Sequence, residues 1–380
     1  MSNAKSTPPK VLHVHSTFAA GGKELRAVQL MNAFGKKLHH TIVSAMPEQM
    51  AAREHIGKHL KVAFPKKFPS LTGFPSPGRL IEIAKAMKPY DLILTYNWGA
   101  MDATMAHGVF AQRLGLPPLI HHEDGFNEDE AGALKKRRNY YRRAALTKST
   151  ALIVPSERLE TIALNRWGQP RANVHRIPNG INTKAFAGQP RPNALRVIKR
   201  EGERWVGTLA GLRPVKQLDQ LVSAFAPLPE HWQLVILGDG PEREAIKVVA
   251  DSLEISHRVH LPGAVPEPSK VIGMFDIFAL SSASEQFPLS VVEAMAAGLP
   301  VAAPEVGDIT SMVAQSNRNF IVKSSDLKGL AKALSDLSQD EELRKSIGLD
   351  NRERAREHFD EADMIDRYRK LYSRAIGCEF

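Results

Sequence analysis

Short apolar segments alternate with amphipathic, helix-like stretches along nearly the whole chain, and this alternation restricts the fold more than any other feature. In the first half, five segments are predicted strands separated by helical patterns: Val11–His15, Thr41–Ser44, Asp91–Leu94, Leu119–His121 and Ala151–Val154. Strands that alternate with helices form parallel sheets that helices cover on both faces. The first half therefore predicts a doubly wound α/β domain.

The second half repeats the same order of elements. Its predicted strands are Arg204–Thr208, Leu234–Leu237, Val259–Leu261, Ile277–Leu280 and Val301–Ala303, with helical patterns at 216–226, 241–253 and 290–297. A chain of 380 residues is long for one α/β domain and sufficient for two, each with its own core. The predicted fold class is α/β, with two tandem Rossmann-like doubly wound domains facing each other across a cleft. Ligands are expected at the carboxyl ends of the strands.

A stretch rich in Pro, Gly and Ala at residues 187–192 is interpreted as the linker between the domains. The predicted N-terminal domain is residues 1–188, and the predicted C-terminal domain is residues 189–355. The tail at residues 356–380 has a charged helical pattern, and we expect it to pack back on the N-terminal domain.

No segment of the sequence indicates export or insertion into a membrane. The longest apolar stretches are short strands, far below the ~20 residues that a membrane span needs. Residues 1–10 are polar and lack the apolar core of a secretory signal, and the single cysteine, Cys378, excludes an intrachain disulfide. We expect a cytoplasmic protein, either free or peripheral to the inner face of the membrane.

Positive charge is concentrated in the first half of the chain. Residues 1–190 hold 27 Lys and Arg against 13 Asp and Glu, a net charge of +14, whereas residues 191–380 have a net charge of −4. This asymmetry predicts an acidic partner for the first half, either a phosphorylated acceptor or an anionic membrane surface, and the alternative is a solvated basic face. Nucleic acid is not expected as a partner, because no recognition module surrounds the densest basic run, Lys135–Arg143.

Two carboxylates of the second half lie eight residues apart, Glu285 before a predicted helix and Glu293 inside it. The first-turn amides of that helix, around Leu289 and Ser290, have no intrahelical partner and favour a diphosphate. Carboxylates on either side of a bound diphosphate can accept hydrogen bonds from sugar and ribose hydroxyls. The structural alternative is that Glu285 caps the helix and Glu293 faces solvent.

The loop after the first strand of the second half carries two cations, Arg213 and Lys216. The sequence shows no cluster of Asp or His that would hold a metal, and fixed cations can stabilise the charge of a leaving diphosphate instead. Two solvated loop cations are the alternative. Asp239, in the Gly238–Pro241 turn, is interpreted as part of a tight strand-to-helix connection.

With these motifs the chain resembles glycosyltransferase family 4, the retaining group 1 transferases of the GT-B fold. Glu285 and Glu293 match the E-x7-E motif of that family, and Gly238–Pro241 matches its glycine turn. Gly21–Glu24 matches its N-terminal G-G-x-E motif, and Pro178–Ile181 matches its interdomain P-N-G-[VI] turn. The motifs occur in the expected order along nearly the whole chain.

The resemblance implies a retaining, hexosyltransferase-like enzyme that needs no metal. It implies a nucleotide-diphosphate-sugar donor, with UDP as the expected carrier, and a hydroxyl acceptor on a glycan or lipid in polysaccharide or lipopolysaccharide synthesis. No cofactor is implied, because the nucleotide-sugar is a substrate. The implied catalytic residues are Asp124, Glu285 and Lys216; the implied donor-binding residues are Gly21, Gly22, Arg213, Lys216, Gly263, Val265, Glu285, Phe287, Pro288, Leu289, Ser290 and Glu293.

The resemblance also implies a role for each group of residues. Glu285 is expected against the hydroxyls of the donor sugar and Glu293 against the ribose. Lys216 is expected to hold the diphosphate, and the loop Gly263–Val265 to line the nucleobase. Gly21–Gly22 would let the backbone of the first domain approach the donor phosphates, because a side chain there would block close contact.

Two positions depart from the family pattern. Gly211 stands where the family usually has an arginine, with Arg213 two positions later. Asp124 stands where the family often has a histidine near the reacting sugar, and an aspartate there can accept a hydrogen bond or a proton. These departures leave two hypotheses, an active transferase with an altered site and a catalytically weak relative that binds nucleotide-sugars.

Overall fold

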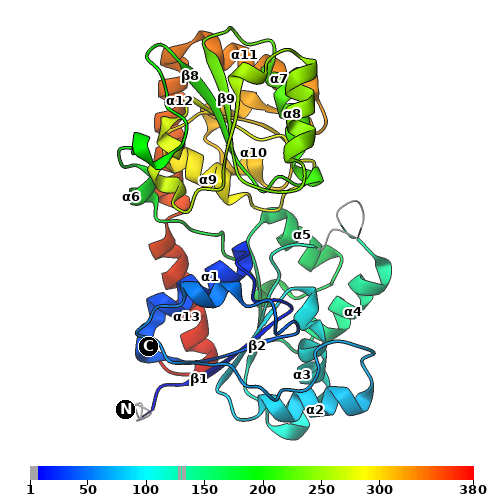
Figure 1. Ribbon diagram of the computed structural model, residues 1–380. Coiled ribbons are helices and arrows are strands. Elements are labelled where there is room, and N and C mark those ends of the chain that lie inside the picture. The colour runs from blue at the N-terminus through cyan, green and yellow to red at the C-terminus, as the bar shows by residue number, and fades with distance from the viewer. Residues whose placement is uncertain (1–6, 127–129, 131–133) are drawn as a thin grey trace. The chain divides into compact units, whose positions relative to one another are not determined.

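A computed structural model describes residues 7–126, 130 and 134–380 of the chain, so the first six residues of the polar N-terminal stretch lie outside it. The chain divides into two compact units (Figure 1). Unit 1 contains the residues up to Pro178 together with Met364–Phe380, and unit 2 is Asn179–Asp363.

The chain passes from one unit to the other at Pro178–Asn179 and at Asp363–Met364, whereas the sequence places the divisions after residues 188 and 355. The stretch at residues 187–192 belongs to unit 2. Arg191 N donates to Lys270 O at 2.6 Å, and Leu195 is buried in the core of unit 2. These contacts bind the stretch at residues 187–192 to unit 2, and the local composition of the sequence does not show them. The division between the units therefore differs from the predicted one.

Unit 1 is built on a seven-stranded parallel sheet in the order β3-β2-β1-β4-β5-β6-β7. Its strands are β1 (Lys10–His15), β2 (His39–Ser44), β3 (Val62–Ala63), β4 (Leu92–Tyr96), β5 (Leu119–His122), β6 (Ala151–Val154) and β7 (Val174–Arg176). Its helices are α1 (Gly22–Phe34), α2 (Pro77–Met87), α3 (Met101–Leu114), α4 (Lys136–Leu146), α5 (Glu157–Asn165) and, from Met364, α13 (Glu361–Ile376). The strand order reverses between β1 and β4, which is where doubly wound sheets bind ligands.

Side chains of β1 alternate between the two faces of this sheet, as the strand period of two requires. Val11 packs with α1 and α13 on one face, whereas Leu12 and Val14 pack with α2 and α3 on the other. Helix α13 contributes Tyr368 and Tyr372 to the core of unit 1, so this core is completed by the last residues of the chain.

Unit 2 is built on a six-stranded parallel sheet in the order β10-β9-β8-β11-β12-β13. Its strands are β8 (Arg204–Leu209), β9 (Trp232–Leu237), β10 (Val259–Gly263), β11 (Ile277–Ala279), β12 (Val301–Pro304) and β13 (Ile321–Val322). Its helices are α6 (Thr183–Phe186), α7 (Leu218–Phe225), α8 (Arg243–Ser252), α9 (Leu289–Ala296), α10 (Ile309–Met312), α11 (Leu327–Gln339) and α12 (Glu341–His358). The order reverses between β8 and β11.

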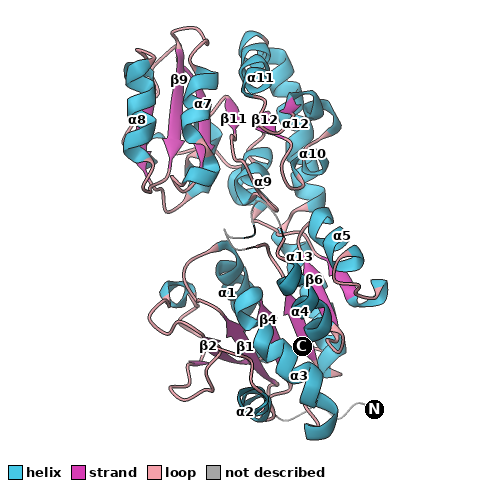
Figure 2. Cartoon of the chain, turned by 90° about the vertical axis from the view of Figure 1, so that its right-hand side faces the viewer, coloured by secondary structure: helices cyan, strands magenta, loops and turns pink. Residues whose placement is uncertain are grey.

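Two apolar layers cover the sheet of unit 2, and helices flank the strands in both units (Figure 2). Helices α7, α8 and α11 bury Val206, Leu234 and Ile236 on one face, while α9 and α12 cover Val235 and Leu237 on the other. The predicted doubly wound fold is therefore confirmed in each unit. None of the helices in the described part of the chain combines the length and apolar character that crossing a bilayer requires.

Candidate functional site

In unit 2, the loops that follow β8 and β11 meet at the reversal of the strand order. Ala283 N donates to Val215 O at 2.9 Å, and Ser281 Oγ donates to Lys216 O at 2.8 Å. Because β8 and β11 are neighbouring parallel strands, their carboxyl ends deliver both loops to the same edge of the sheet. The two hydrogen bonds then fix Lys216 beside the loop that carries Glu285.

Lys216 and Glu285, which are 69 positions apart in sequence, form an ion pair. The Lys216 ammonium contacts Glu285 Oε1, and Ser282 Oγ donates to the same oxygen at 2.7 Å. The two side chains are 16% and 12% exposed, so both remain accessible to a ligand. A cation and a carboxylate at one place can hold a phosphate and a sugar hydroxyl together.

A glycine beyond β12 supports the Glu285 loop. Gly307 has φ +59°, and a Cβ atom at this position would lie 2.7 Å from the carbonyl oxygens of Glu285 and Gln286. Any other residue would push the loop away from its position. Sequence reasoning missed Gly307 and Ser282, although Ser282 lies only three residues before Glu285.

Helix α9 begins directly after this loop, at Leu289, with Pro288 as its N-cap. Val291 N donates to Pro288 O at 3.1 Å, while the amides of Leu289 and Ser290 are the first two of the helix and have no intrahelical acceptor. The ring of Phe287 packs edge-on against the ring of Phe359, with 5.6 Å between the ring centres. The side chain of Phe287 is thus anchored in the core, and the helix start carries the partial positive charge that favours an anion.

Glu293 lies one turn inside α9, and burial raises its pKa to about 7. Among the described residues, none donates a hydrogen bond to its carboxylate. A buried carboxylate without a donor is costly to ionise, and hydroxyl donors from a ligand would favour the charged form. This environment differs from the solvent-facing alternative, because the residue is only partly exposed.

Arg213 is exposed and lies over the backbone of Gly211. Its Nε atom is 3.6 Å from the point where a Cβ atom of Gly211 would be. A Cβ atom at Gly211 would therefore be in ordinary van der Waals contact with the side chain of Arg213. The loop that lacks the arginine of the family at Gly211 thus carries a cation two positions later, at Arg213.

The other predicted donor-binding loop of unit 2 follows β10. Gly263 has φ +96°, its carbonyl accepts from Gly238 N at 3.0 Å, and Val265 packs against the apolar core. Asp239 Oδ2 accepts from Ala264 N at 2.9 Å, which agrees with a structural role for Asp239. The loop lies two strands away from β8 in the sheet.

Glycines 21 and 22 of unit 1 lie at the start of α1 and behave differently. A Cβ atom at Gly21 would lie 2.8 Å from Glu24 Oε2, whereas one at Gly22 would meet nothing within 4 Å. Glu24 is buried and accepts from Thr17 Oγ1 at 3.0 Å, which holds the loop before α1. A side chain at Gly21 would require Glu24 to shift, whereas Gly22 leaves open space in front of the helix start.

Asp124 follows β5 in unit 1 and is held by a two-point ion pair. Arg26 NH1 and NH2 donate to the two oxygens of Asp124, the second at 2.9 Å. The backbone amide of Asp124 donates to Asn97 Oδ1 at 2.8 Å. Burial opposes the charge of Arg26, but Asp124 reverses this effect and raises the pKa of the guanidinium. Sequence reasoning missed Arg26, which lies 98 positions away.

The two neighbours of Asp124 serve the interior of unit 1. Glu123 is fully buried, and its carboxylate lies 3.3 Å from Arg142 Nε. His122 is also buried, with Nε2 at 2.8 Å from the hydroxyl of Tyr372, and burial followed by the charge of Arg26 holds its pKa well below the ordinary value. Of the three residues, Asp124 alone reaches partial exposure.

The predicted site residues therefore fall in two groups. Unit 2 holds Arg213, Lys216, Gly263, Val265, Glu285, Phe287, Pro288, Leu289, Ser290 and Glu293, and unit 1 holds Gly21, Gly22 and Asp124. Within unit 2 the structure brings together Lys216, Glu285 and the start of α9. Across residues 7–126, 130 and 134–380, no group of three or more His, Cys, Asp and Glu is arranged to hold a metal ion.

Two family models match the chain, one in each half. The model described as glycosyl transferases group 1 matches residues 193–354, and the model described as glycosyltransferase family 4 matches residues 20–185.

Individual proteins of known name are similar to the chain as well. N-acetyl-alpha-D-glucosaminyl L-malate synthase of Bacillus anthracis is 30% identical over 174 residues, which cover 45% of this chain and 46% of that protein. A GDP-mannose-dependent alpha-mannosyltransferase of Mycolicibacterium smegmatis is 28% identical over 296 residues, 75% of this chain and 74% of that protein. The crystal structure of Anabaena HepE in complex with UDP superposes with a TM-score of 0.79 at 19% identity, covering 96% of this chain and 99% of that chain.

Proposed function

Because the chain belongs to the group 1 transferases of glycosyltransferase family 4, we propose that it moves a sugar from a nucleotide-diphosphate-sugar to an acceptor hydroxyl with retention of configuration. The observation that carries this proposal is the Lys216–Glu285 pair beside the start of α9 in unit 2. These groups combine a fixed cation, free helix amides and a carboxylate, which are the partners of a diphosphate and a sugar.

In the proposed reaction, the bond between the anomeric carbon and the diphosphate oxygen breaks while the acceptor oxygen forms the new bond. Lys216 and the first amides of α9 stabilise the charge that develops on the leaving diphosphate. Glu285 orients the sugar hydroxyls, and Glu293 accepts from the ribose. Asp124, oriented by Arg26, accepts a hydrogen bond or a proton at the reacting groups. Neither a metal nor a cofactor takes part in the proposed steps.

We propose UDP as the carrier of the sugar. HepE, which superposes over nearly the whole chain, is crystallised with UDP, while the mycobacterial relative is named for GDP-mannose. The loop Gly263–Val265 would line the base. The acceptor is proposed to be a glycan or a lipid-linked glycan bound by unit 1, with peripheral contact to an anionic membrane on the cytoplasmic side.

A thermal-shift screen tests the donor specificity, because a ligand that binds only the native state raises the melting temperature. UDP-glucose, UDP-galactose, UDP-N-acetylglucosamine and GDP-mannose would be compared at equal concentration. We expect one UDP-sugar to raise Tm most and to be hydrolysed slowly in the absence of acceptor. Binding without any hydrolysis or transfer would favour the catalytically weak relative instead, and no binding at all would contradict the proposal.

Glu293 gives the donor affinity a predictable pH dependence. Its pKa of about 7 means that the folded protein holds this proton more tightly than the unfolded chain, so ionising it as pH rises lowers stability. A ribose that donates to the carboxylate favours the charged form. If only the ionised form binds, the dissociation constant of UDP-glucose should fall about tenfold between pH 6 and pH 8.

Isothermal titration at several pH values measures this dependence. The diphosphate diester of UDP-glucose stays ionised over the range, so the ligand contributes no titration of its own. Glu293→Gln keeps the shape of the side chain but cannot ionise, and should flatten the profile. An equal pH dependence in the parent protein and in Glu293→Gln would remove Glu293 from the donor site.

A further inference from the structure

Two adjacent serines follow β11 in unit 2, and both are buried, with Ser281 5% and Ser282 2% exposed. Their hydroxyls serve different partners. Ser281 Oγ donates to the backbone oxygen of Lys216 at 2.8 Å, whereas Ser282 Oγ donates to Glu285 Oε1 at 2.7 Å. One serine therefore holds the backbone of the cationic loop, and the other holds the carboxylate itself.

The two oxygens of the Glu285 carboxylate have different surroundings. Oε1 accepts from the Ser282 hydroxyl and contacts the Lys216 ammonium. Within the part of the chain that the structure describes, no group donates to Oε2. Because an ionised carboxylate accepts at both oxygens and this side chain is partly exposed, Oε2 is the oxygen that a ligand can reach.

Lys216 and Ser282 are not equivalent partners of Glu285 when a donor binds. In the proposed function, the Lys216 ammonium holds the diphosphate, so the donor competes for the contact that Glu285 has with this cation. The Ser282 hydroxyl is buried and gives its one proton to Glu285. Glutamate is among the side chains with the most rotamer freedom, so a remaining donor is needed to hold it in one position.

We propose that Ser282 is a positioning residue for the donor sugar: its hydroxyl fixes the Glu285 carboxylate through Oε1, so that Oε2 is presented to the sugar hydroxyls. Ser282 acts through Glu285 and is not itself a contact of the sugar. A group that is held in its binding geometry before the ligand arrives needs no rearrangement on binding. This inference rests on the proposed function, which assigns Glu285 to the sugar and Lys216 to the diphosphate.

Isothermal titration of Ser282→Ala with two probes tests this role on the full chain. The first probe is the nucleotide-sugar that raises Tm most in the screen above, and the second is the same nucleoside diphosphate without the sugar. We expect the variant to bind the nucleotide-sugar roughly tenfold or more weakly than the parent protein, because a hydrogen bond to a charged group is lost. The affinity for the nucleoside diphosphate should stay within about twofold, since that probe has no sugar for Glu285 to orient.

Two conservative variants show whether the hydroxyl is what matters. Ser282→Thr keeps the hydroxyl and should bind the nucleotide-sugar as the parent protein does. Ser282→Cys adds no carbon atom, but a thiol is a weak donor, so its affinity should lie between those of Ser282→Ala and the parent protein. Thermal melting verifies that each variant folds, and if the extra methyl group of threonine lowers Tm, the cysteine variant provides the comparison.

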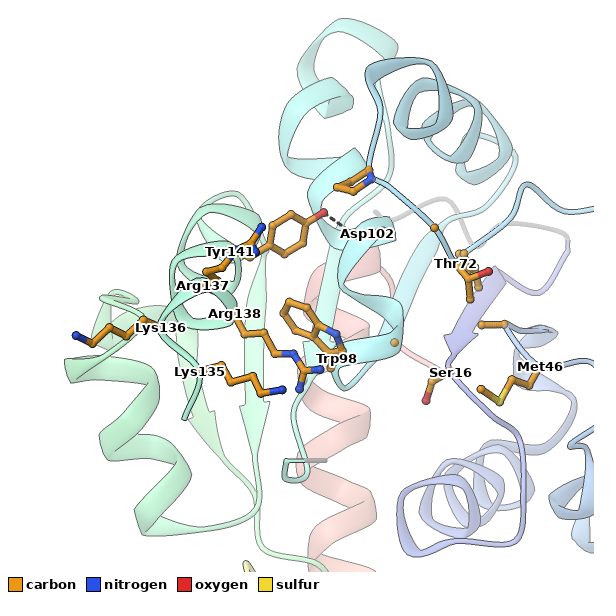
Figure 3. Close-up of a pocket in the computed structure, with 15 residues that line it drawn as sticks. Ser16, Met46, Thr72, Trp98, Asp102, Lys135, Lys136, Arg137, Arg138 and Tyr141 are labelled. Atoms are coloured by element: carbon orange, nitrogen blue, oxygen red, sulfur yellow. Dashed lines mark hydrogen bonds between the residues drawn. The ribbon is translucent and has the colours of Figure 1, made fainter. Parts of the chain in front are cut away.

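Two further variants serve as matched controls. Ser281→Ala makes the same change one position earlier, and it should weaken both probes by the same factor, because its bond to the Lys216 backbone acts on the diphosphate that they share. Tyr141→Phe removes the same kind of bond in unit 1, where the Tyr141 hydroxyl donates to Asp102 Oδ1 at 2.6 Å beside a cavity of about 920 Å³ (Figure 3). This variant should bind both probes as the parent protein does.

Three results would overturn the positioning role of Ser282. They are an unchanged affinity of Ser282→Ala for the nucleotide-sugar, equal losses for the two probes in this variant, and an equal loss in Ser282→Ala and a fully folded Ser282→Thr. In each of these cases the parent protein still binds and turns over its donor, so the proposed function stands. A parent protein that binds no nucleotide-sugar would contradict the proposed function instead, which separates the two failures.

Discussion

Replacing Lys216 with alanine is expected to lower kcat about 10²- to 10³-fold, the range found when a single group that stabilises developing charge is removed. The structure gives two reasons for an effect of this size. The ammonium pairs with Glu285, four residues before the start of α9, and hydrogen bonds from Ser281 and Ala283 hold its loop against the loop of Glu285. A mobile side chain or a water molecule would not reproduce that position.

Steady-state kinetics with the preferred UDP-sugar measures the effect of Lys216→Ala. Lys247→Ala is the matched control, because Lys247 also pairs with a glutamate of unit 2, Glu244, but on an exposed helical surface. The control should retain kcat within about twofold, as surface ion pairs contribute little. Similar kcat values for Lys216→Ala and the parent protein would show that leaving-group stabilisation resides elsewhere.

Asp124→Asn is expected to reduce both activity and stability. The amide accepts no proton and carries no charge, so transfer should fall ~10²-fold or more if Asp124 acts at the reacting groups. The same change leaves the buried guanidinium of Arg26 without its ionic partner, which costs roughly 3–5 kcal/mol of unfolding free energy. Urea unfolding and kcat per folded molecule separate the two effects.

Glu123→Gln is the control for the second effect. Glu123 is also a carboxylate beside a buried arginine, Arg142, but unlike Asp124 its side chain is fully buried. The Glu123→Gln variant should lose stability and keep its turnover per folded molecule. If Glu123→Gln loses turnover while Asp124→Asn keeps it, the assignment in this loop is off by one residue. If neither variant loses turnover, the loop has a structural role only.

The sequence was sufficient to predict ten of the thirteen described strands and the parallel order they imply, because each lies in an apolar segment next to a helical pattern. Three-residue β11 was found because apolar residues lie on both sides of it, at Phe275 and Leu280, whereas β3, β7 and β13, of two or three residues, were missed. A period of two cannot be recognised in so short a segment. Strand β7 ends two residues before the P-N-G-I turn begins, so turn residues dominated the pattern there.

The basic run Lys135–Arg143 shows where local sequence is ambiguous. Taken as one patch, it predicts either a solvated face or a surface for an anionic partner, and for Arg142 both interpretations are wrong. Helix α4 turns Arg142 into the interior, where it meets Glu123 and Glu130, while Arg138, one turn earlier, remains partly exposed. The partners that decide between burial and exposure lie on other segments, so composition alone could not separate these arginines.

The residue pairs that define the candidate site could not be predicted from the sequence either. Lys216 and Glu285 were each identified from their motifs, but their contact depends on two loops brought together by adjacent strands. The partnership of Arg26 with Asp124 joins α1 to the loop that follows β5. Motifs identify such residues individually, and the sheet topology determines which of them meet.

The return of α13 to unit 1 has a consequence for biosynthesis. His122 contacts Tyr372 across 250 positions, and Tyr368 and Tyr372 complete the core beside Val11. A nascent chain therefore exposes one apolar face of the first sheet throughout synthesis of unit 2. Unit 2 itself is one continuous segment of the chain, Asn179–Asp363. Domains that fold as they leave the ribosome usually do so from the N-terminus. Here the segment made first completes its native packing only after α13 has been synthesised.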